Sequence, residues 1–177
     1  MKLILFFFIG MIGSFLNGIY DLSVVSLDGA PVPLSQFQGK KLLIVVLPVS
    51  RQANDISLLK AMDSISRKYS VQISVIGIPS GENGYVADSL ASLKQFYGSL
   101  MGSQILLTQG MYTNKSSGSR QSALFAWLTD KNKNTHFDQD VKGPGHKFFI
   151  DQKGQLLAVF PPDIPLSDRT MQHLITP

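Results

Sequence analysis

Hydrophobic and polar positions divide the chain into segments that predict strands. Residues 41–49 form an apolar run rich in Val, Ile and Leu, which is typical of a strand buried on both faces. Residues 71–80 predict a second buried strand. Residues 19–40 instead alternate apolar and polar side chains around Asp28-Gly29, the pattern of a hairpin between two short strands. A second hairpin is expected over residues 147–162. A short apolar run within residues 104–110 predicts one further strand or extended segment.

Apolar residues at helical spacing predict helices between and after these strands. Asn54 or Asp55 is the expected N-cap of the first helix, and Ser167 is the expected cap of the last. Strand–helix alternation followed by a hairpin and a helix predicts an α/β fold, a three-layer sandwich around a central mixed sheet with an N-terminal β-hairpin. The residues expected to face the core are Ile56, Leu59, Met62, Ile65, Leu90, Leu93, Phe96, Leu124, Trp127 and Leu128.

The first eighteen residues have the features of a secretory signal peptide. Lys2 supplies a positive start, residues 3–12 are apolar but too few to span a bilayer, and Gly13, Ser14 and Gly18 offer small residues for cleavage. We therefore expect residues 1–18 to be removed, residues 19–177 to form one domain in the periplasm or outside the cell, and no stable membrane insertion after cleavage. The alternative is an uncleaved N-terminal membrane anchor.

Composition restricts the chemistry that is open to this chain. It contains no cysteine, so thiol catalysis, disulfides and lipid attachment at cysteine are all excluded. The formal net charge is +4, and removal of residues 1–18 lowers it by one. The basic residues are scattered rather than clustered on one face with aromatic residues, so we expect no nucleic-acid partner.

Four segments of the chain, in the same order along the sequence, resemble the glutathione peroxidase family. They are "IYDLSVVSLDGAPVPLSQFQGKKLLIV", "VIGIPSGENG", "SALFAWLTDK" and "HKFFIDQKGQLLAVFPP", and together they cover nearly all of the chain from Ile19 onward. The resemblance implies a thioredoxin-like fold. It does not by itself imply the family's activity.

The family's peroxidase chemistry implies a cysteine or selenocysteine nucleophile assisted by Gln, Trp and Asn side chains. In the matching segments, the nucleophile falls at Arg51, Gln52 or Ala53, and the register among them stays open. Glu82, which only accepts hydrogen bonds when ionised, stands where the family has Gln. The positions that match the other elements of the lost site are Ser80 for a second cysteine and Gly143 and Pro144 for the Trp-Asn pair.

Two other groups of polar residues are candidate sites. Arg51 and Glu82 are expected on neighbouring strand-end loops, where they could form an ion pair or where Arg51 could bind a carboxylate or phosphate; the alternative is that both are solvated loop residues. Residues 136–146 contain His136, Asp138, Asp140 and His146. Their spacing matches no closed metal motif, so we expect neither a metal nor another cofactor.

These observations predict an exported, non-catalytic protein that binds a peptide or a small anionic ligand. The binding surface would be the loops of the former active site, residues 48–54, 80–87 and 138–146, with Arg51, Glu82 and His146 as ligand-binding candidates. Three alternatives remain open: an enzyme of another class that uses these three residues for acid–base chemistry, a residual oxidative-stress role by family similarity, and an interaction module with no ligand site.

Overall fold

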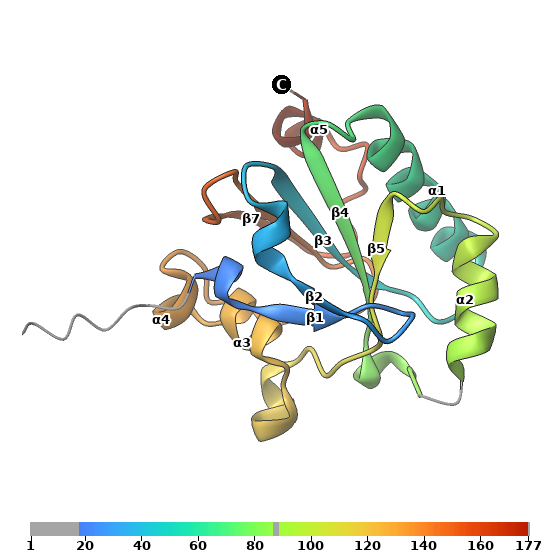
Figure 1. The fold of residues 1–177 in the computed structure, drawn as a ribbon, viewed down its shortest axis with the longest axis horizontal. Helices are drawn as coiled ribbons and strands as arrows, with labels where there is room; N and C mark the ends of the chain where they lie inside the picture. The colour runs from blue at the N-terminus through green and yellow to red at the C-terminus, as the bar shows by residue number, and fades with distance from the viewer. Residues whose placement is uncertain (1–17, 87–88, 177) are drawn as a thin grey trace, which may run out of the picture.

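Five strands form a mixed sheet in the order β5-β4-β3-β6-β7 (Figure 1). This is a computed structural model, and it describes residues 18–86 and 89–176. The predicted signal segment, apart from Gly18, lies outside the described residues. The strands of the sheet are β3 (Lys41–Leu47), β4 (Ile73–Pro79), β5 (Ile105–Leu107), β6 (Lys147–Ile150) and β7 (Leu156–Phe160).

The sheet separates two hydrophobic cores, which explains the continuous apolar run in β3. Because successive side chains of a strand point to opposite faces, Leu43 and Val45 enter one core while Leu42 and Ile44 enter the other. All four side chains are fully buried. The predicted strand buried on both faces is therefore confirmed.

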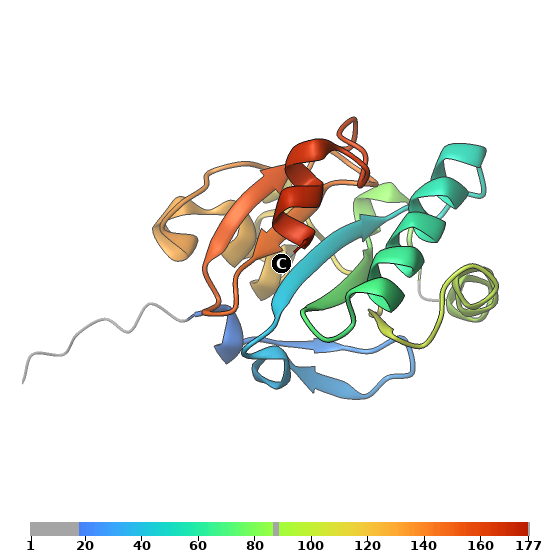
Figure 2. The ribbon, with the colours of Figure 1, turned by 90° about the horizontal axis from the view of Figure 1, so that it is seen from above.

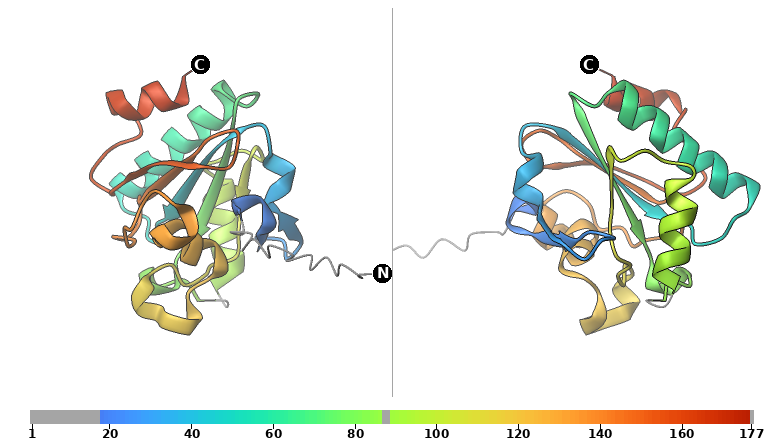
Figure 3. Two further views of the ribbon diagram at one scale, coloured as in Figure 1. Left: turned by 90° about the vertical axis from the view of Figure 1, so that its left-hand side faces the viewer. Right: turned by 45° about the vertical axis from the view of Figure 1, so that its right-hand side comes forward.

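Helices cover one face of the sheet, and helices together with the N-terminal hairpin cover the other. α1, α5 and α2 share the first core, with α1 and α5 lying over the sheet and α2 beside the β5 edge (Figure 2). α3 packs in the second core (Figure 3). The predicted three-layer α/β sandwich is thus confirmed. The helices are α1 (Ala53–Lys68), α2 (Leu90–Gly98), α3 (Ala123–Thr129), α4 (Lys131–Asn134) and α5 (Arg169–Ile175), with 3-10 turns η1 (Ile19–Asp21), η2 (Leu34–Phe37), η3 (Gly81–Asn83) and η5 (Lys115–Arg120).

The N-terminal hairpin, β1 (Ser23–Val25) and β2 (Pro31–Pro33), forms where the sequence predicts it. Gly29 turns the chain with a φ of +88°, a value that glycine adopts without steric cost. The hairpin is tied to the end of β5, because the Leu27 N–H donates to the Leu107 carbonyl at 2.8 Å. The hairpin thereby protects part of an edge strand that would otherwise be open.

Two helices begin with caps other than those expected. Gln52 occupies the N-cap position of α1, and its side chain makes no capping hydrogen bond. The expected caps Asn54 and Asp55 lie inside the first turn instead. At α5, the cap is Asp168 rather than Ser167, and its carboxylate accepts hydrogen bonds from the backbone N–H groups of residues 170 and 171. Ser and Asp are both good N-cap residues, so at α5 only the backbone path selects between them. At α1 the backbone path instead places the cap at Gln52, which is not a favoured cap residue.

None of the helices in the described residues is long and apolar enough to cross a membrane.

Candidate functional site

Three loops of the predicted site meet at one end of the sheet, where β3 and β4 finish and β6 begins; we call this end the loop edge. β3 and β4 are parallel, whereas β6 runs antiparallel to β3, so the carboxyl ends of β3 and β4 lie beside the amino end of β6. Two backbone hydrogen bonds fix the junction: the Val46 N–H donates to the His146 carbonyl at 2.9 Å, and the Gly145 N–H donates to the Val46 carbonyl at 2.7 Å. The structure therefore brings together the segments that the sequence singles out.

The turn between β3 and α1, where the resemblance places a nucleophile, carries Arg51 and Gln52. The Arg51 guanidinium donates to Ser92 Oγ at 3.2 Å and lies 5.2 Å from the centre of the Phe96 ring, so it faces α2. The buried Tyr97 hydroxyl donates to the Pro48 carbonyl at 2.9 Å and holds the turn against α2. No atom of this turn can act as a thiolate does.

Glu82 organises the loop after β4. Its carboxylate accepts hydrogen bonds from Ser80 Oγ at 2.7 Å, from the backbone N–H groups of Thr113 and Asn114 at 3.0 Å, and from Ser117 Oγ at 2.5 Å. Partial burial opposes the charge and raises the pKa of Glu82, but these hydrogen bonds outweigh it and lower the pKa to about 2. The carboxylate thus fastens η3 to the loop that leads into η5.

Arg51 and Glu82 consequently form no ion pair among the described residues. Arg51 is turned toward α2, and the Glu82 oxygens are already used by donors from residues 80 and 113–117. A ligand that needs a free carboxylate at Glu82 would have to displace several charge-assisted hydrogen bonds, each a strong interaction.

The loop before β6 is a tight turn without polar side chains at the matched positions. Gly143 and Gly145 adopt φ values of +116° and +83°, which favour glycine, and Pro144 lies between them. Where the resemblance implies a Trp-Asn pair, this turn therefore supplies neither an indole nor an amide.

His146 lies in the core rather than facing the loops. Only 1% of the residue is exposed, its Nδ1 accepts from the Lys142 N–H at 3.2 Å, and its ring packs 4.9 Å from the Phe148 ring. Nε2 has no hydrogen-bond partner among the described residues. Burial, followed by the charges of Lys147 and Lys142, lowers the pKa of His146 to about 4, so the imidazole is neutral at pH 7.

The other three potential metal ligands of residues 136–146 take part in separate interactions. Asp138 pairs with the Lys115 ammonium, Asp140 accepts from the backbone N–H of Lys115 at 2.9 Å, and His136 Nδ1 lies 2.8 Å from Thr135 Oγ1. No group of three His, Asp or Glu side chains suited to a metal ion occurs within residues 18–86 and 89–176.

A cavity of about 540 Å³ lies beside the loop edge, between α1 and the chain that precedes α5. This volume is in the range of small-molecule sites. From the predicted binding loops, Asn54, Pro144 and Gly145 line it. The other walls include Leu58 and Ala61 of α1 and the segment before α5, and Lys147 contributes the cation. The cavity is thus continuous with the third loop but is not formed by Arg51, Glu82 or His146.

Lys147 is the polar residue that sequence reasoning missed. It lies in β6 opposite Val45 and is only 1% exposed. Burial lowers its pKa to about 8, against a smaller opposing effect of the Asp163 charge. The available signal was its place in the apolar run "HKFFID", because a charged residue inside a strand covered on both faces is unusual.

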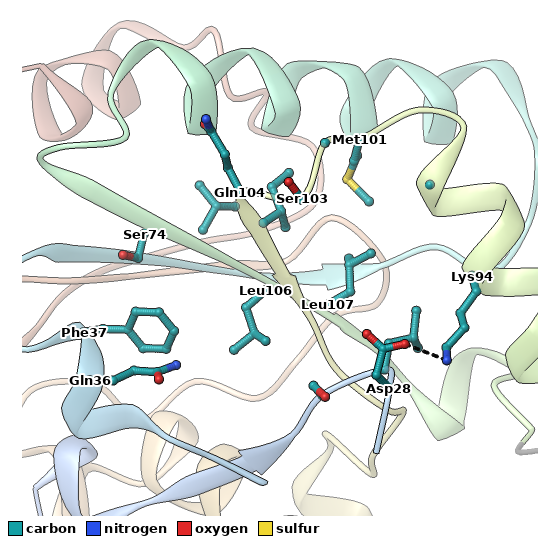
Figure 4. A pocket seen from close by; sticks show the side chains of 16 residues that line it. Asp28, Gln36, Phe37, Ser74, Lys94, Met101, Ser103, Gln104, Leu106 and Leu107 are labelled. Atoms are coloured by element: carbon teal, nitrogen blue, oxygen red, sulfur yellow. Dashed lines mark ion pairs between the residues drawn. The ribbon is translucent and has the colours of Figure 1, made fainter. Parts of the chain in front are cut away.

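A larger trough of about 800 Å³ lies along the side of the sheet that is bounded by β5. Figure 4 shows its walls: Gln36 and Phe37 from η2 on one side, and Lys94 from α2 paired with Asp28 on the other. None of the predicted site residues lines this trough. It is therefore separate from the edge at which the three loops meet.

Comparisons with known proteins match the structure and not the sequence. No family model matches the chain, and neither does any curated protein. Among solved structures, the apo form of Trgpx superposes with a TM-score of 0.63 at 18% identity, over 90% of this chain and 95% of that one. T. cruzi GPX1 gives 0.62 at 20% identity, over 90% and 97%.

A secreted Mycobacterium tuberculosis disulfide oxidoreductase homologous to E. coli DsbE is also similar, with a TM-score of 0.52 at 12% identity over 88% of this chain and 95% of that one. Identities this low bear on the fold alone. The resemblance drawn from the sequence is confirmed at that level, and the chain has a thioredoxin-like fold of the kind found in glutathione peroxidases, without a cysteine.

Proposed function

We propose that this protein is an exported, non-catalytic member of the thioredoxin-like fold that binds a small, mainly apolar ligand beside the former active-site loops. The observation that carries the proposal is the cavity of about 540 Å³ at the loop edge, next to a turn that has lost every group needed for peroxide reduction. The proposal is thus that the protein binds a ligand at this place in the fold but does not carry out peroxide reduction there.

The contacts of the loop edge support the non-catalytic part of the proposal. Peroxide reduction by this fold requires a nucleophile that can be activated by neighbouring donors. Arg51 and Gln52 offer no such nucleophile, and Glu82 at pH 7 is an acceptor that is already saturated. The turn at Gly143 and Pro144 offers no side-chain donor.

The walls of the cavity support the class of ligand. Leu58, Ala61, Pro162, Pro165 and Leu166 supply most of the apolar lining, and polar side chains from α1, β6 and the segment before α5 complete the walls. Mainly apolar walls with a few placed polar groups are the usual composition of small-molecule sites. The carboxylates of Asp55 and Asp163 accompany the single cation, so the lining favours an uncharged ligand over the anionic one that the sequence suggests.

Export remains part of the proposal on the basis of residues 1–18. The apolar run and small residues of this segment are those of a signal peptide. The likeness to a secreted disulfide oxidoreductase is compatible with it.

A peroxidase assay tests the part of the proposal that the protein is non-catalytic. Purified protein would be given hydrogen peroxide or an organic hydroperoxide, with glutathione or thioredoxin as reductant, beside the Gln52→Cys variant. We expect no turnover by the wild type and at most slow thiol oxidation by Gln52→Cys, because the assisting donors are absent. Turnover by the wild type would contradict the proposal.

A dye-binding titration tests the cavity. Nile red, an uncharged apolar probe, should bind the wild type with increased fluorescence. Ser57, which lines the cavity from α1, allows a matched pair: Ser57→Phe should weaken binding at least about tenfold by filling the space, whereas Ser57→Ala should bind as the wild type does. Equal binding by both variants would show that the dye lies elsewhere, and would contradict the proposed site.

A further inference from the structure

Lys147 lines the cavity, and two backbone carbonyls hold its side chain. Its Nζ donates to the Ile164 carbonyl at 2.6 Å and to the Pro161 carbonyl at 3.3 Å. Both acceptors belong to the segment that connects β7 to α5, which also forms one wall of the cavity. The amine is therefore fixed in position rather than free to reach solvent.

The structure gives the Lys147 amine two acceptors, which equals the number of N–H donors on a neutral amine. An ammonium group has three N–H donors, and the structure gives acceptors for two of them. Within residues 18–86 and 89–176, no carboxylate lies within ion-pair distance of Nζ. A neutral amine donates its two hydrogens to the two carbonyls and keeps a lone pair in the remaining tetrahedral direction.

The charges around Lys147 are few. Asp55 and Asp163 line the same cavity; Asp55 accepts from the Ser50 hydroxyl, and Asp163 favours the charged lysine only in part. On the neighbouring residue, His146 is buried and neutral at pH 7. Burial dominates these effects and lowers the pKa of Lys147 to about 8.

We propose that Lys147 is a nucleophilic amine that captures aldehydes or ketones entering the cavity as a Schiff base. This inference rests on the cavity of the proposed function and names the class of ligand that would react there, a small carbonyl compound with an apolar body. It adds a covalent step to a site that the preceding proposal treats as a simple binding site.

The chemistry needs no oxidant or reductant. The lone pair of Nζ attacks the carbonyl carbon and forms a C–N bond while the C=O π bond breaks. The nitrogen then gives up one proton and the former carbonyl oxygen takes up one, which gives a neutral carbinolamine. Loss of the nitrogen-bound hydrogen and of the hydroxyl as water then leaves a C=N bond. Water attack reverses the sequence, so capture is reversible unless the imine is reduced.

The structure contains an internal control for this amine. Lys41 Nζ also donates to two backbone carbonyls, those of Leu174 at 2.8 Å and Thr176 at 3.3 Å. Lys41 does not line the cavity. A reaction that depends only on hydrogen bonding to carbonyls would label both lysines, whereas a reaction that depends on the cavity would label Lys147.

Reductive trapping tests the proposal. Purified protein would be incubated at pH 7 with butanal and sodium cyanoborohydride, and each lysine would be followed by peptide mass spectrometry. A pKa of about 8 leaves roughly one amine in ten unprotonated at pH 7, against about one in 2,500 for an ordinary lysine. We expect Lys147 to be alkylated about tenfold faster than Lys41 or the exposed lysines, after allowance for its restricted access.

Two variants make the result decisive. Lys147→Arg keeps hydrogen-bond donors but removes the nucleophile, and it should lose the fast modification. Ser57→Phe keeps Lys147 but fills the cavity, and it should slow labelling of Lys147 at least tenfold while leaving Lys41 unchanged. Labelling of Lys147 no faster than Lys41, or equal labelling in Ser57→Phe, would overturn the proposal.

Failure of this inference can be told from failure of the proposed function. If Nile red binds in a manner sensitive to Ser57→Phe but Lys147 is not labelled, the cavity binds ligands without covalent capture and only the present inference falls. If the dye does not bind and Lys147 is not labelled, both fall.

Discussion

At the scale of single residues, the loop edge is built from side chains that hold one another. Glu82 accepts donors from residues 80 and 113–117, and Arg51 is engaged by α2. The sequence correctly indicates that Glu82 is an acceptor. It could not indicate which groups donate to the carboxylate, because all of these partners except Ser80 lie more than 30 residues farther along the chain and meet Glu82 only through folding.

Lys147 is a second residue whose surroundings could not be predicted from the sequence. Its place in the apolar run "HKFFID" indicates that it is unusual but does not show which groups surround it. Its burial follows from the position of β6 inside the sheet, and its two acceptors come from the segment after β7. Both facts depend on contacts between distant segments.

His146 gives a pH-dependent prediction at this scale. The pKa of His146 is about 4 in the folded protein and about 6.5 when unfolded. Between these values the unfolded state binds a proton that the folded state does not, so the free energy of unfolding should decrease as the pH falls from about 6.5 to 4, by up to about 1.4 kcal/mol per pH unit.

Urea denaturation at a series of pH values measures this slope. His146→Gln should flatten it relative to the wild type. A slope that persists in His146→Gln would assign the effect to another group. Glu82 acts in a lower window, since its stabilising charge is lost only as the pH falls from about 4.5 toward 2.

At the scale of the elements, the hydrophobic pattern located the strands and helices well and their caps poorly. The apolar run at 41–49 became β3, and the helical spacing from Ile56 to Ile65 became the buried face of α1. These patterns report burial over many residues, so single exceptions do not hide them. A cap depends on one backbone turn, which the pattern does not specify.

The uncapped start of α1 gives a prediction at this scale. Gln52 makes no side-chain capping bond, so Gln52→Ser, which places a good cap at this position, should raise the free energy of unfolding by about 0.5–1 kcal/mol. Asp168→Ala at α5 should do the reverse, lowering it by about 1 kcal/mol, because it removes two accepted hydrogen bonds.

Chemical denaturation of both variants measures the changes against the wild type. Because Gln52 lies in the turn where the resemblance places a nucleophile, the stabilised variant also serves as a folded control in the peroxidase assay. A loss of stability in Gln52→Ser would show that the glutamine side chain contributes something other than a cap.

At the scale of the whole molecule, one sheet is shared by two cores. β3 sends Leu42 into the core under the hairpin and α3, and Leu43 into the core under α1 and α5. Because every central strand contributes to both cores, neither core can lose its packing without disturbing the other. We therefore expect the domain to unfold as one cooperative unit.

Two probes test this expectation. Trp127, the single tryptophan of the chain, reports on one core by fluorescence, and far-UV circular dichroism reports mostly on helices of the other. Their urea transitions should coincide, and Leu42→Ala and Leu43→Ala should each lower the free energy of unfolding by about 2–5 kcal/mol in both signals. Transitions that separate in either variant would mean that the cores unfold independently.

The sequence by itself determined the class of fold and the absence of thiol chemistry, because periodicity and composition are properties of the chain that folding does not change. Only the tertiary structure decided which side chains meet. It saturated Glu82, turned Arg51 toward α2, buried His146 and placed Lys147 in a cavity, since each of these outcomes depends on groups that are distant in sequence and adjacent only after the sheet has formed.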